Sequence, residues 1–381
     1  MSSLELTLLY LLAAVLGVVA CRSLKLPPIL GYLAVGVLIG PNALALAGEA
    51  SGVRHLGEFG VVFLMFVIGL EFNLSKLRAM RSHVFKLGLS QVMLTILIGT
   101  FGSLMLAWVL PKMWSMSWQS ALALSGALAM SSTAIVVKMM ADRLEMESEH
   151  GKRVMGVLLF QDLAVVPLLV VIPALGSEPE VLLREIGIAL AKAAVLITLL
   201  LVGGQRLMRW WLTLVARRKS EELFVLNLLM ITLGLAWLTE LAGLSLALGA
   251  FIAGILISET EYKHQVEADI RPFHDVLLGL FFITVGMLLD WRPVFERWGL
   301  VLLFVTAPVL FKLLLVTALA RLYGASTGVS LRTGLYLAQA GEFGFVLLAL
   351  AQQQELVPPE LLNPILASMV LSMLATPFII Q

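Results

Sequence analysis

The apolar stretch LLFQDLAVVPLL places an amide and a carboxylate side by side, at Gln161 and Asp162. An ionised carboxylate in hydrocarbon surroundings is costly unless it is paired or solvated. Such a group can bind a cation while it is deprotonated and release the cation when a proton discharges it. The amide oxygen of Gln161 would then replace part of the cation's hydration shell. A salt bridge that joins two helices is the structural alternative for Asp162.

Two more charged residues lie inside apolar runs. Lys312, in APVLFKLLLVTALA, is either a charge partner that keeps Asp162 ionised without a cation, or a side chain that reaches back to the membrane surface. Glu342, in AQAGEFGF, either neutralises the positive end of a half-helix, which is an architectural role, or is a second proton site. We favour the charge partner for Lys312 and the architectural role for Glu342.

The composition indicates that these charged residues lie within a membrane protein. The chain has 381 residues, of which 60% are hydrophobic and 13% charged, and its mean hydropathy is +0.98. Soluble domains carry about 25% charged residues, so the sequence indicates an all-α polytopic membrane protein surrounded by lipid. A net charge of +1 gives no basis for a nucleic-acid partner, and a single cysteine excludes an internal disulfide.

Apolar runs between charged or Gly/Pro-rich breaks predict thirteen spans. They cover residues 4–22, 28–44, 56–73, 83–110, 118–140, 152–175, 182–208, 222–241, 244–258, 273–290, 298–321, 331–352 and 360–380. Of the 26 Lys and Arg residues, 19 fall in odd-numbered loops and five in even-numbered loops. Because basic residues collect on the cytoplasmic side, the N-terminus is predicted outside and the C-terminus in the cytoplasm.

Two pairs of spans align at nearly one offset. LGYLAVGVLIGP over LGAFIAGILISE pairs Gly36 with Gly254, and FLMFVIGLEF over LFFITVGMLL pairs Gly69 with Gly286. The copies are seven spans apart, an odd number, so they have opposite topology. The sequence therefore predicts one transport domain with an inverted repeat, as transporters often have. Its parts are repeat one at 1–176, a linker helix at 180–210 and repeat two at 220–381.

Spans 5 and 12 correspond in the two repeats, and both gather small polar residues or glycines at mid-span, in AMSSTAIV and AQAGEFGF. Substrate sites of inverted-repeat transporters lie on helices broken at corresponding positions, where backbone carbonyls and amides can meet an ion. We therefore expect both spans to be broken. Close helix packing through small residues is the alternative.

On these residues the chain resembles the Kef-type potassium/proton antiporters of the monovalent cation:proton antiporter-2 family. The matching segments are LPPILGYLAVGVLIGP, LMFVIGLEFN, ALAMSSTAIVVKMM, GVLLFQDLAVVPLL, DIRPFHDVLLGLFFITVGMLLD and AGEFGFVLLALA. The resemblance implies a homodimer with a scaffold and a mobile core, in which broken spans 5 and 12 cross and access alternates by an elevator-like movement. It also implies that the hydroxyl residues of span 5 face Asp162, that Gln161 marks a potassium-selective member and that Lys312 is the core lysine. These hydroxyl residues are Ser131, Ser132 and Thr133.

Kef-type proteins continue into a cytoplasmic nucleotide-binding domain that is regulated by glutathione. We expect such a domain, or an ancillary subunit, after residue 381; otherwise this member lacks it. The acidic segment HQVEADIRPF is expected to be the loop that meets this domain, through Glu267 and Asp269. Nucleotide and glutathione would act only with that domain present, so no cofactor is expected in the chain itself.

The sequence thus predicts exchange of one K⁺ for one H⁺ at Asp162, with K⁺ leaving a bacterial cell across its inner membrane as H⁺ enters. Gln161 adds no second titrating charge, so the exchange would be electroneutral. Sodium/proton exchange is the alternative, because ion selectivity depends on the size and ligand field of the site. A potassium channel is disfavoured by the inverted repeat and by the lack of a filter motif such as TVGYG. An intramembrane aspartyl protease needs a second membrane aspartate, so we expect no enzyme.

Overall fold

The computed structural model describes residues 3–23, 28–45, 51–71, 79–109, 114, 116–177 and 181–380. Within these ranges all regular structure is helical. A segment in lipid must satisfy its backbone N–H and C=O groups internally, and a helix does so. Five helices begin at a serine whose side chain accepts a hydrogen bond from the backbone N–H three residues on. These serines are Ser117, Ser132, Ser220, Ser245 and Ser326.

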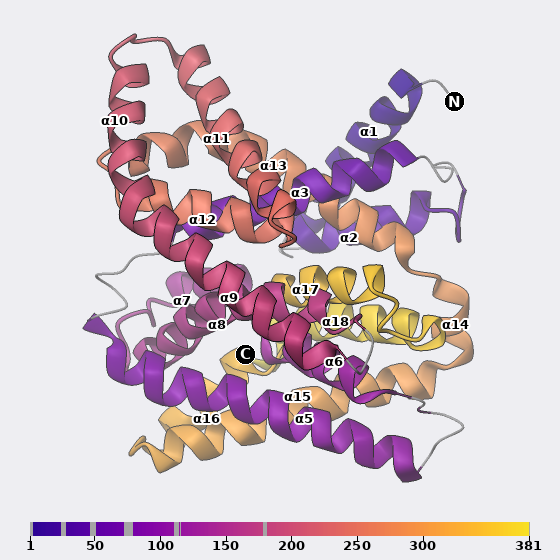
Figure 1. The fold of residues 1–381 in the computed structure, drawn as a ribbon. Coiled ribbons are helices and arrows are strands. Elements are labelled where there is room, and N and C mark those ends of the chain that lie inside the picture. Colours follow the sequence, from indigo (N-terminus) through magenta and orange to yellow (C-terminus); the bar gives the residue numbers. More distant parts are fainter. Residues whose placement is uncertain are drawn as a thin grey trace. The chain divides into compact units, whose positions relative to one another are not determined.

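The chain divides into two compact units, and each takes helices from both repeats. Unit 1 (residues 1–20, 31–74 and 169–287) holds most or all of α1 (Ser3–Ser23), α2 (Pro28–Ile39), α3 (Ser51–Glu71), α9 (Leu182–Leu199), η2 (Leu200–Gly204), α10 (Gln205–Ala216), α11 (Glu221–Leu241), α12 (Leu246–Ser258) and α13 (Lys263–Leu288). Unit 2 (residues 21–30, 75–168 and 288–381) holds η1 (His83–Gly88), α5 (Leu89–Val109), α6 (Trp118–Ala129), α7 (Thr133–Asp142), most of α8 (Glu149–Ala174), α14 (Trp291–Glu296), α15 (Trp298–Leu322), α16 (Thr327–Leu337), α17 (Glu342–Gln353) and α18 (Pro359–Ile379) (Figure 1).

Each predicted span corresponds to one helix or to a run of consecutive helices. Within the described residues, seven helices are long and apolar enough to cross a membrane. The pair α16 and α17, bent by 46°, forms an eighth span, and five shorter apolar helices correspond to the remaining five. The short predicted spans 2 and 9 are α2 with 12 residues and α12 with 13. The protein is an integral membrane protein, as the sequence predicts.

Glycines confirm the inverted repeat inside unit 1. A Cβ added to Gly36 on α2 would lie 3.0 Å from the Cα of Gly286 on α13. A Cβ added to Gly69 on α3 would lie 3.1 Å from the Cα of Gly254 on α12. The sequence alignment pairs Gly36 with Gly254 and Gly69 with Gly286, so the repeat maps one helix crossing onto the other. Only glycine permits backbones to approach this closely, which is why these positions stand out in the alignment.

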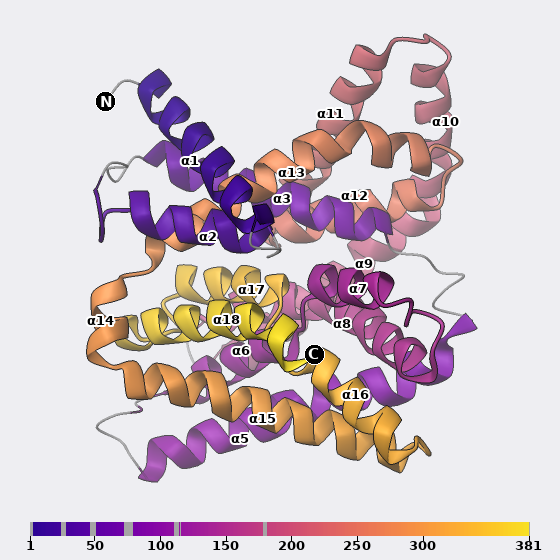
Figure 2. The same cartoon turned by 180° about the vertical axis from the view of Figure 1, so that it is seen from behind.

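Unit 2 is organised around α15. This helix packs lengthwise against α16 and crosses α5, and α18 and α14 also pack against it (Figures 1 and 2). One buried apolar cluster joins η1, α7, α8, α15 and α16. It includes Leu87, Val136, Val157, Val316 and Tyr336, all of them nearly inaccessible to solvent. The cluster holds α7 and α16, one half-helix of each broken span, against α8 and α15.

Two features differ from the sequence prediction. The acidic segment predicted as a loop is helical, because α13 begins at Lys263 and its first turns carry Glu267 and Asp269. The carboxylate of Glu267 lies 3.3 Å from the Nδ1 of His264 and 4.0 Å from the Nζ of Lys263, and such pairs one turn apart support a helix. The six-residue helix α14 was not predicted at all.

Candidate functional site

Spans 5 and 12 are broken at the predicted places. Residues 130–132 separate α6 from α7, with Met130 at φ −76°, ψ 147° and Ser132 at φ −74°, ψ 109°. Residues 338–341 separate α16 from α17. Each break leaves backbone carbonyls at the end of one half-helix and N–H groups at the start of the next without partners along the helix. These groups give the site its polarity within an apolar unit.

The two breaks cross at Gly341 and Ser131. A Cβ on Gly341 would lie 2.5 Å from the carbonyl carbon of Ser131 and 2.6 Å from its oxygen. A Cβ on Gly344, one turn into α17, would lie 2.9 Å from the carbonyl oxygen of Ala127. The crossing therefore depends on glycine, because any side chain would push the two backbones apart.

The ammonium of Lys312 joins the negative ends of both broken spans. Its Nζ donates to the carbonyl oxygens of Met130 (2.9 Å) and Gln339 (2.8 Å) and to the Oγ of Ser131 (2.9 Å). These acceptors use all three N–H groups of an ammonium. Lys312 is only 2% exposed, so its side chain does not reach the membrane surface. It instead places a positive charge where two half-helices end, which is favourable for their dipoles.

Glu342 lies at the N-terminal end of a half-helix, whereas Lys312 lies at two C-terminal ends. It is the first residue of α17 and is buried, and its Oε1 lies 3.5 Å from the backbone N of Ala134 in the first turn of α7. One carboxylate is thus close to the N-termini of both second half-helices, where negative charge is favourable. This placement supports the architectural role.

Gln161, on α8, is bound into the break of span 5. Its Oε1 accepts from the backbone N of Ser131 (2.8 Å), and its Nε2 donates to the Oγ of Ser131 (3.3 Å). The Oγ of Ser131 in turn donates to the carbonyl oxygen of Leu337, at the end of α16 (2.8 Å). Asp162 follows on the same helix and is half-buried. The predicted ion-binding acid therefore adjoins a residue that contacts both breaks through Ser131.

The other predicted ligands divide into two kinds. The Oγ of Ser132 accepts from the backbone N of Ile135 (3.3 Å) and so caps α7. Thr133 is half-buried, and its Oγ1 has no hydrogen-bond partner among the described residues. Ser132 thus helps to shape the break, whereas the Thr133 hydroxyl has bonding capacity left for a ligand.

Comparison with known proteins identifies the family. The family profile described as "Sodium/hydrogen exchanger, transmembrane" matches residues 9–381. The chain belongs to the sodium/hydrogen exchanger family. This is a transporter family, so the expectation that the protein is not an enzyme is confirmed.

The relatives refine this assignment. The chain is 39% identical to "K(+) efflux antiporter 1, chloroplastic" of Arabidopsis thaliana over 92% of its own length and 30% of that protein. It is also 39% identical to "Putative K(+) efflux antiporter KefB" of Alkalimonas amylolytica over 98% of its own length and 56% of that protein. The chain thus spans between 30% and 56% of the length of these relatives. The recognition of a Kef-type exchanger is confirmed.

A solved structure supports the fold. The sodium proton antiporter MjNhaP1 from Methanocaldococcus jannaschii at pH 8 aligns with a TM-score of 0.67, at 17% identity, and the alignment covers 99% of this chain and 96% of that one. At this identity the likeness concerns the fold alone. The predicted all-α membrane architecture with broken, crossing spans 5 and 12 is confirmed.

Two glutamines of this exchanger escaped the sequence analysis. Gln91 on α5 is fully buried and donates from its Nε2 to the carbonyl oxygen of Ala129 (3.1 Å). Gln339 in the break of span 12 is 2% exposed, and both its amide atoms lack hydrogen-bond partners among the described residues. A lone amide in an apolar run was the available signal for each. We call Gln91, Ser131, Gln161 and Lys312 the crossing network.

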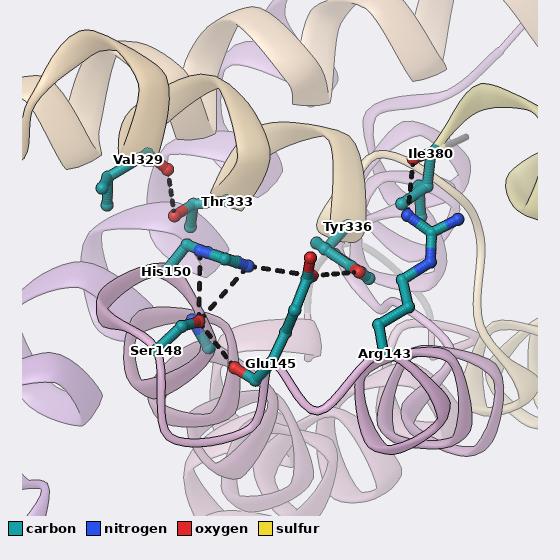
Figure 3. Close-up of polar contacts among 9 residues, drawn as sticks. Arg143, Glu145, Ser148, His150, Val329, Thr333, Tyr336 and Ile380 are labelled. Carbon is teal, nitrogen blue, oxygen red and sulfur yellow. Dashed lines mark hydrogen bonds and ion pairs between the residues drawn. The ribbon is translucent and has the colours of Figure 1, made fainter.

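A second polar cluster joins the connection between α7 and α8, which lies outside the spans, to α16. We call Glu145, Ser148, His150 and Tyr336 the loop cluster (Figure 3). The Oε2 of Glu145 accepts from the hydroxyl of Tyr336 on α16 (2.7 Å) and lies 3.0 Å from the Nε2 of His150. The hydrogen bond from Tyr336 and, next, the one with His150 hold the pKa of Glu145 below its ordinary value. The cluster ties the α7–α8 connection to the broken span 12.

Proposed function

We propose that this exchanger is a potassium/proton antiporter in which Asp162 binds either K⁺ or H⁺. The placement of Asp162 carries the proposal. This acid directly follows Gln161, the residue that is hydrogen-bonded into the break of span 5 and linked through Ser131 to span 12. Binding of a cation or a proton at Asp162 can therefore affect the geometry of the place where the two broken spans cross. The similarity to proteins named K(+) efflux antiporters supports K⁺ as the cation.

The proposed cycle uses one carboxylate for two ligands. Deprotonated Asp162 binds the cation. The Thr133 hydroxyl, the break carbonyls and the second lone pair of the Gln161 amide oxygen, whose first lone pair accepts from Ser131, replace part of the cation's water shell. Protonation discharges the carboxylate and releases the cation. Because Gln161 is neutral, one K⁺ exchanges for one H⁺ and no net charge moves. Lys312 would serve as the charge partner when Asp162 is ionised without a cation, and to bond to it directly it would give up one of its three hydrogen bonds at the breaks.

The remaining expectations belong to the same proposal. The excess of basic residues in odd-numbered loops supports an outside N-terminus and a cytoplasmic C-terminus in a bacterial inner membrane. Unit 2 would be the mobile core and unit 1 the scaffold of a homodimer. Glu267 and Asp269, now placed on α13, would meet a cytoplasmic regulatory domain or ancillary subunit where one is present. Nucleotide and glutathione would act through that partner and would not bind this chain directly.

Proteoliposomes with an internal pH dye test the exchange directly. A proton gradient is imposed, and potassium, sodium or lithium is added outside for the wild type and for Asp162→Asn. Potassium should dissipate the gradient in the wild type and have no effect in Asp162→Asn. The matched control is Asp142→Asn, at the exposed end of α7, which should behave as the wild type.

The outcomes separate the candidate functions. Equal responses to sodium and potassium would retain Asp162 as the site and replace the potassium assignment by sodium/proton exchange. Potassium flux without proton movement would indicate a channel. Exchange that survives in Asp162→Asn would reject Asp162 and shift attention to Glu342, the other acid at the crossing.

A further inference from the structure

Gln91 lies on a span that takes no part in the crossing, yet it reaches the break. The start of span 4 packs tightly on α8: a Cβ on Gly88 would lie 2.4 Å from the Cβ of Phe160, and a Cβ on Gly156 would lie 2.5 Å from the Cβ of His83. These glycines let the two helices approach, and Gln91, one turn beyond Gly88, then meets the residue after Phe160. That residue is Gln161.

The amide of Gln91 is oriented by the backbone of span 5. Its Nε2 donates to the carbonyl oxygen of Ala129, the last residue of α6 (3.1 Å), and to the Oγ1 of Thr95 (3.2 Å). Its Oε1 accepts from the Nε2 of Gln161 (2.9 Å). Turning this amide over would set its oxygen against the oxygen of Ala129 and its N–H groups against those of Gln161. Hydrogen-bond chemistry therefore permits one orientation.

That orientation is passed on to Gln161. With its Nε2 facing Gln91, its Oε1 faces the backbone N of Ser131, which is a donor. A turned Gln161 amide would put N–H groups against that donor and leave it without an acceptor in a buried site, which is costly. The break of span 5 frees the carbonyl of Ala129 and the N–H of Ser131. These two backbone groups thus fix the orientation of both side-chain amides.

We propose that Gln91 is a positioning residue for the cation site: it fixes the Gln161 amide and through it the geometry of the span-5 break beside Asp162. This inference rests on the proposed exchange at Asp162. A break that is held open keeps its oxygens at a fixed spacing, which favours the larger of two cations. A loosened break lets the oxygens close around a smaller one. Gln91 is then a determinant of potassium preference that acts through Gln161.

The experiment is a double-mutant cycle in proteoliposomes. The apparent KM for potassium and for sodium is measured for the wild type, Gln91→Leu, Gln161→Leu and the double variant. Gln91→Leu should lower the preference for potassium over sodium roughly fivefold, the factor that corresponds to one hydrogen bond, with kcat little changed. The double variant should match Gln161→Leu alone, because Gln91 acts through that residue.

Two further variants separate positioning from general damage. Ser103→Ala removes another buried polar group of α5, whose contacts are Trp114 and Met116, and should keep the wild-type preference. Gln91→Glu should also keep it at acidic pH, since a protonated carboxyl can donate to Ala129 and accept from Gln161. This variant carries the test if Gln91→Leu fails to fold.

Each outcome decides the proposal. A wild-type preference in Gln91→Leu, or effects of the two glutamine changes that multiply in the double variant, would overturn it. So would a Gln91→Glu protein that loses the preference as Gln91→Leu does. Failure of the proposed function has a different signature, namely exchange that persists in Asp162→Asn whatever residue occupies position 91.

Discussion

The crossing network and the loop cluster lie in the same unit, yet their hydrogen bonds respond to pH in opposite ways. In the crossing network two neutral amides, one hydroxyl and one ammonium meet backbone groups, and donors and acceptors match. Removing a proton from Lys312 would lose a bond there. In the loop cluster the hydroxyl of Tyr336 and the ring of His150 both bond to one carboxylate oxygen of Glu145. These bonds change with the charge of Glu145.

This contrast indicates where proton coupling resides. A buried network in which every donor meets an acceptor is rigid, and it holds the crossing in one geometry. In the proposed exchange the titratable acid is Asp162, which directly follows Gln161 of the network. The loop cluster contributes a pH dependence of stability, because it ties α16 to the α7–α8 connection, and it need not take part in transport. The predictions below test this division, from the largest expected effect to the smallest.

Lys312→Met should have the largest effect. The apolar side chain fills similar space but leaves two carbonyl oxygens and a serine hydroxyl without their donor in a buried site. We expect a loss of about 3 kcal/mol or more, measured as a lower unfolding temperature of the purified protein in detergent. Lys152→Met, which removes an exposed lysine paired with Glu147, should change the unfolding temperature little. Equal losses in the two variants would contradict the assignment of Lys312 to the crossing.

Gly341→Ala should come next. The new Cβ would meet the carbonyl of Ser131 at about 2.5 Å, and both atoms are held by backbone, so the two breaks must separate. We expect a loss of about 2 kcal/mol together with a loss of exchange in the proteoliposome assay. Gly328→Ala on α16 is the matched control, since a Cβ there meets nothing within 4 Å. A Gly341→Ala protein with wild-type exchange would show that the crossing tolerates separation.

The sequence was sufficient for features that follow from composition and symmetry. Thirteen apolar runs predicted the spans, and the matched glycines predicted the repeat that Gly36 with Gly286 and Gly69 with Gly254 now display. The breaks in spans 5 and 12 were predicted because small polar residues recur at corresponding positions. These signals are local or periodic, so they are visible without knowing which helices meet.

Partnerships between distant residues were not predictable in the same way. Gln91 stands alone in an apolar run, and its role appears only when α5 packs on α8. The amide oxygen of Gln161 was expected to face the ion, yet in the structure it accepts from Ser131, because a broken helix needs an acceptor for its freed N–H. The acidic segment HQVEADIRPF was expected to be a loop because the family that the chain resembles has one there, although α13 extends through this segment.

Tyr336→Phe should act on the loop cluster alone, with a pH-dependent effect. Because the folded pKa of Glu145 is depressed, its stabilisation is present above the unfolded pKa of about 4.3 and disappears as pH falls through the folded pKa. Removing the hydroxyl should cost about 1 kcal/mol at pH 7, and the difference from the wild type should shrink below pH 4. Unfolding temperatures measured across this range test the sign. Tyr323→Phe, which loses a bond to the neutral Ser90, should show a difference that is independent of pH.

Arg143→Gln should have the smallest effect and sharpens the boundary of the loop cluster. In Figure 3 Arg143 points toward Ile380, and its Nη1 donates to that carbonyl oxygen at an exposed site (2.9 Å). Water can replace such a bond, so we expect a change in stability within about 0.5 kcal/mol and unchanged exchange. A larger loss would mean that the end of α18 is held by this contact, and that the loop cluster extends beyond Glu145 and its two partners. A small loss would leave the tie between the α7–α8 connection and α16 dependent on the hydrogen bond that Tyr336 donates to Glu145.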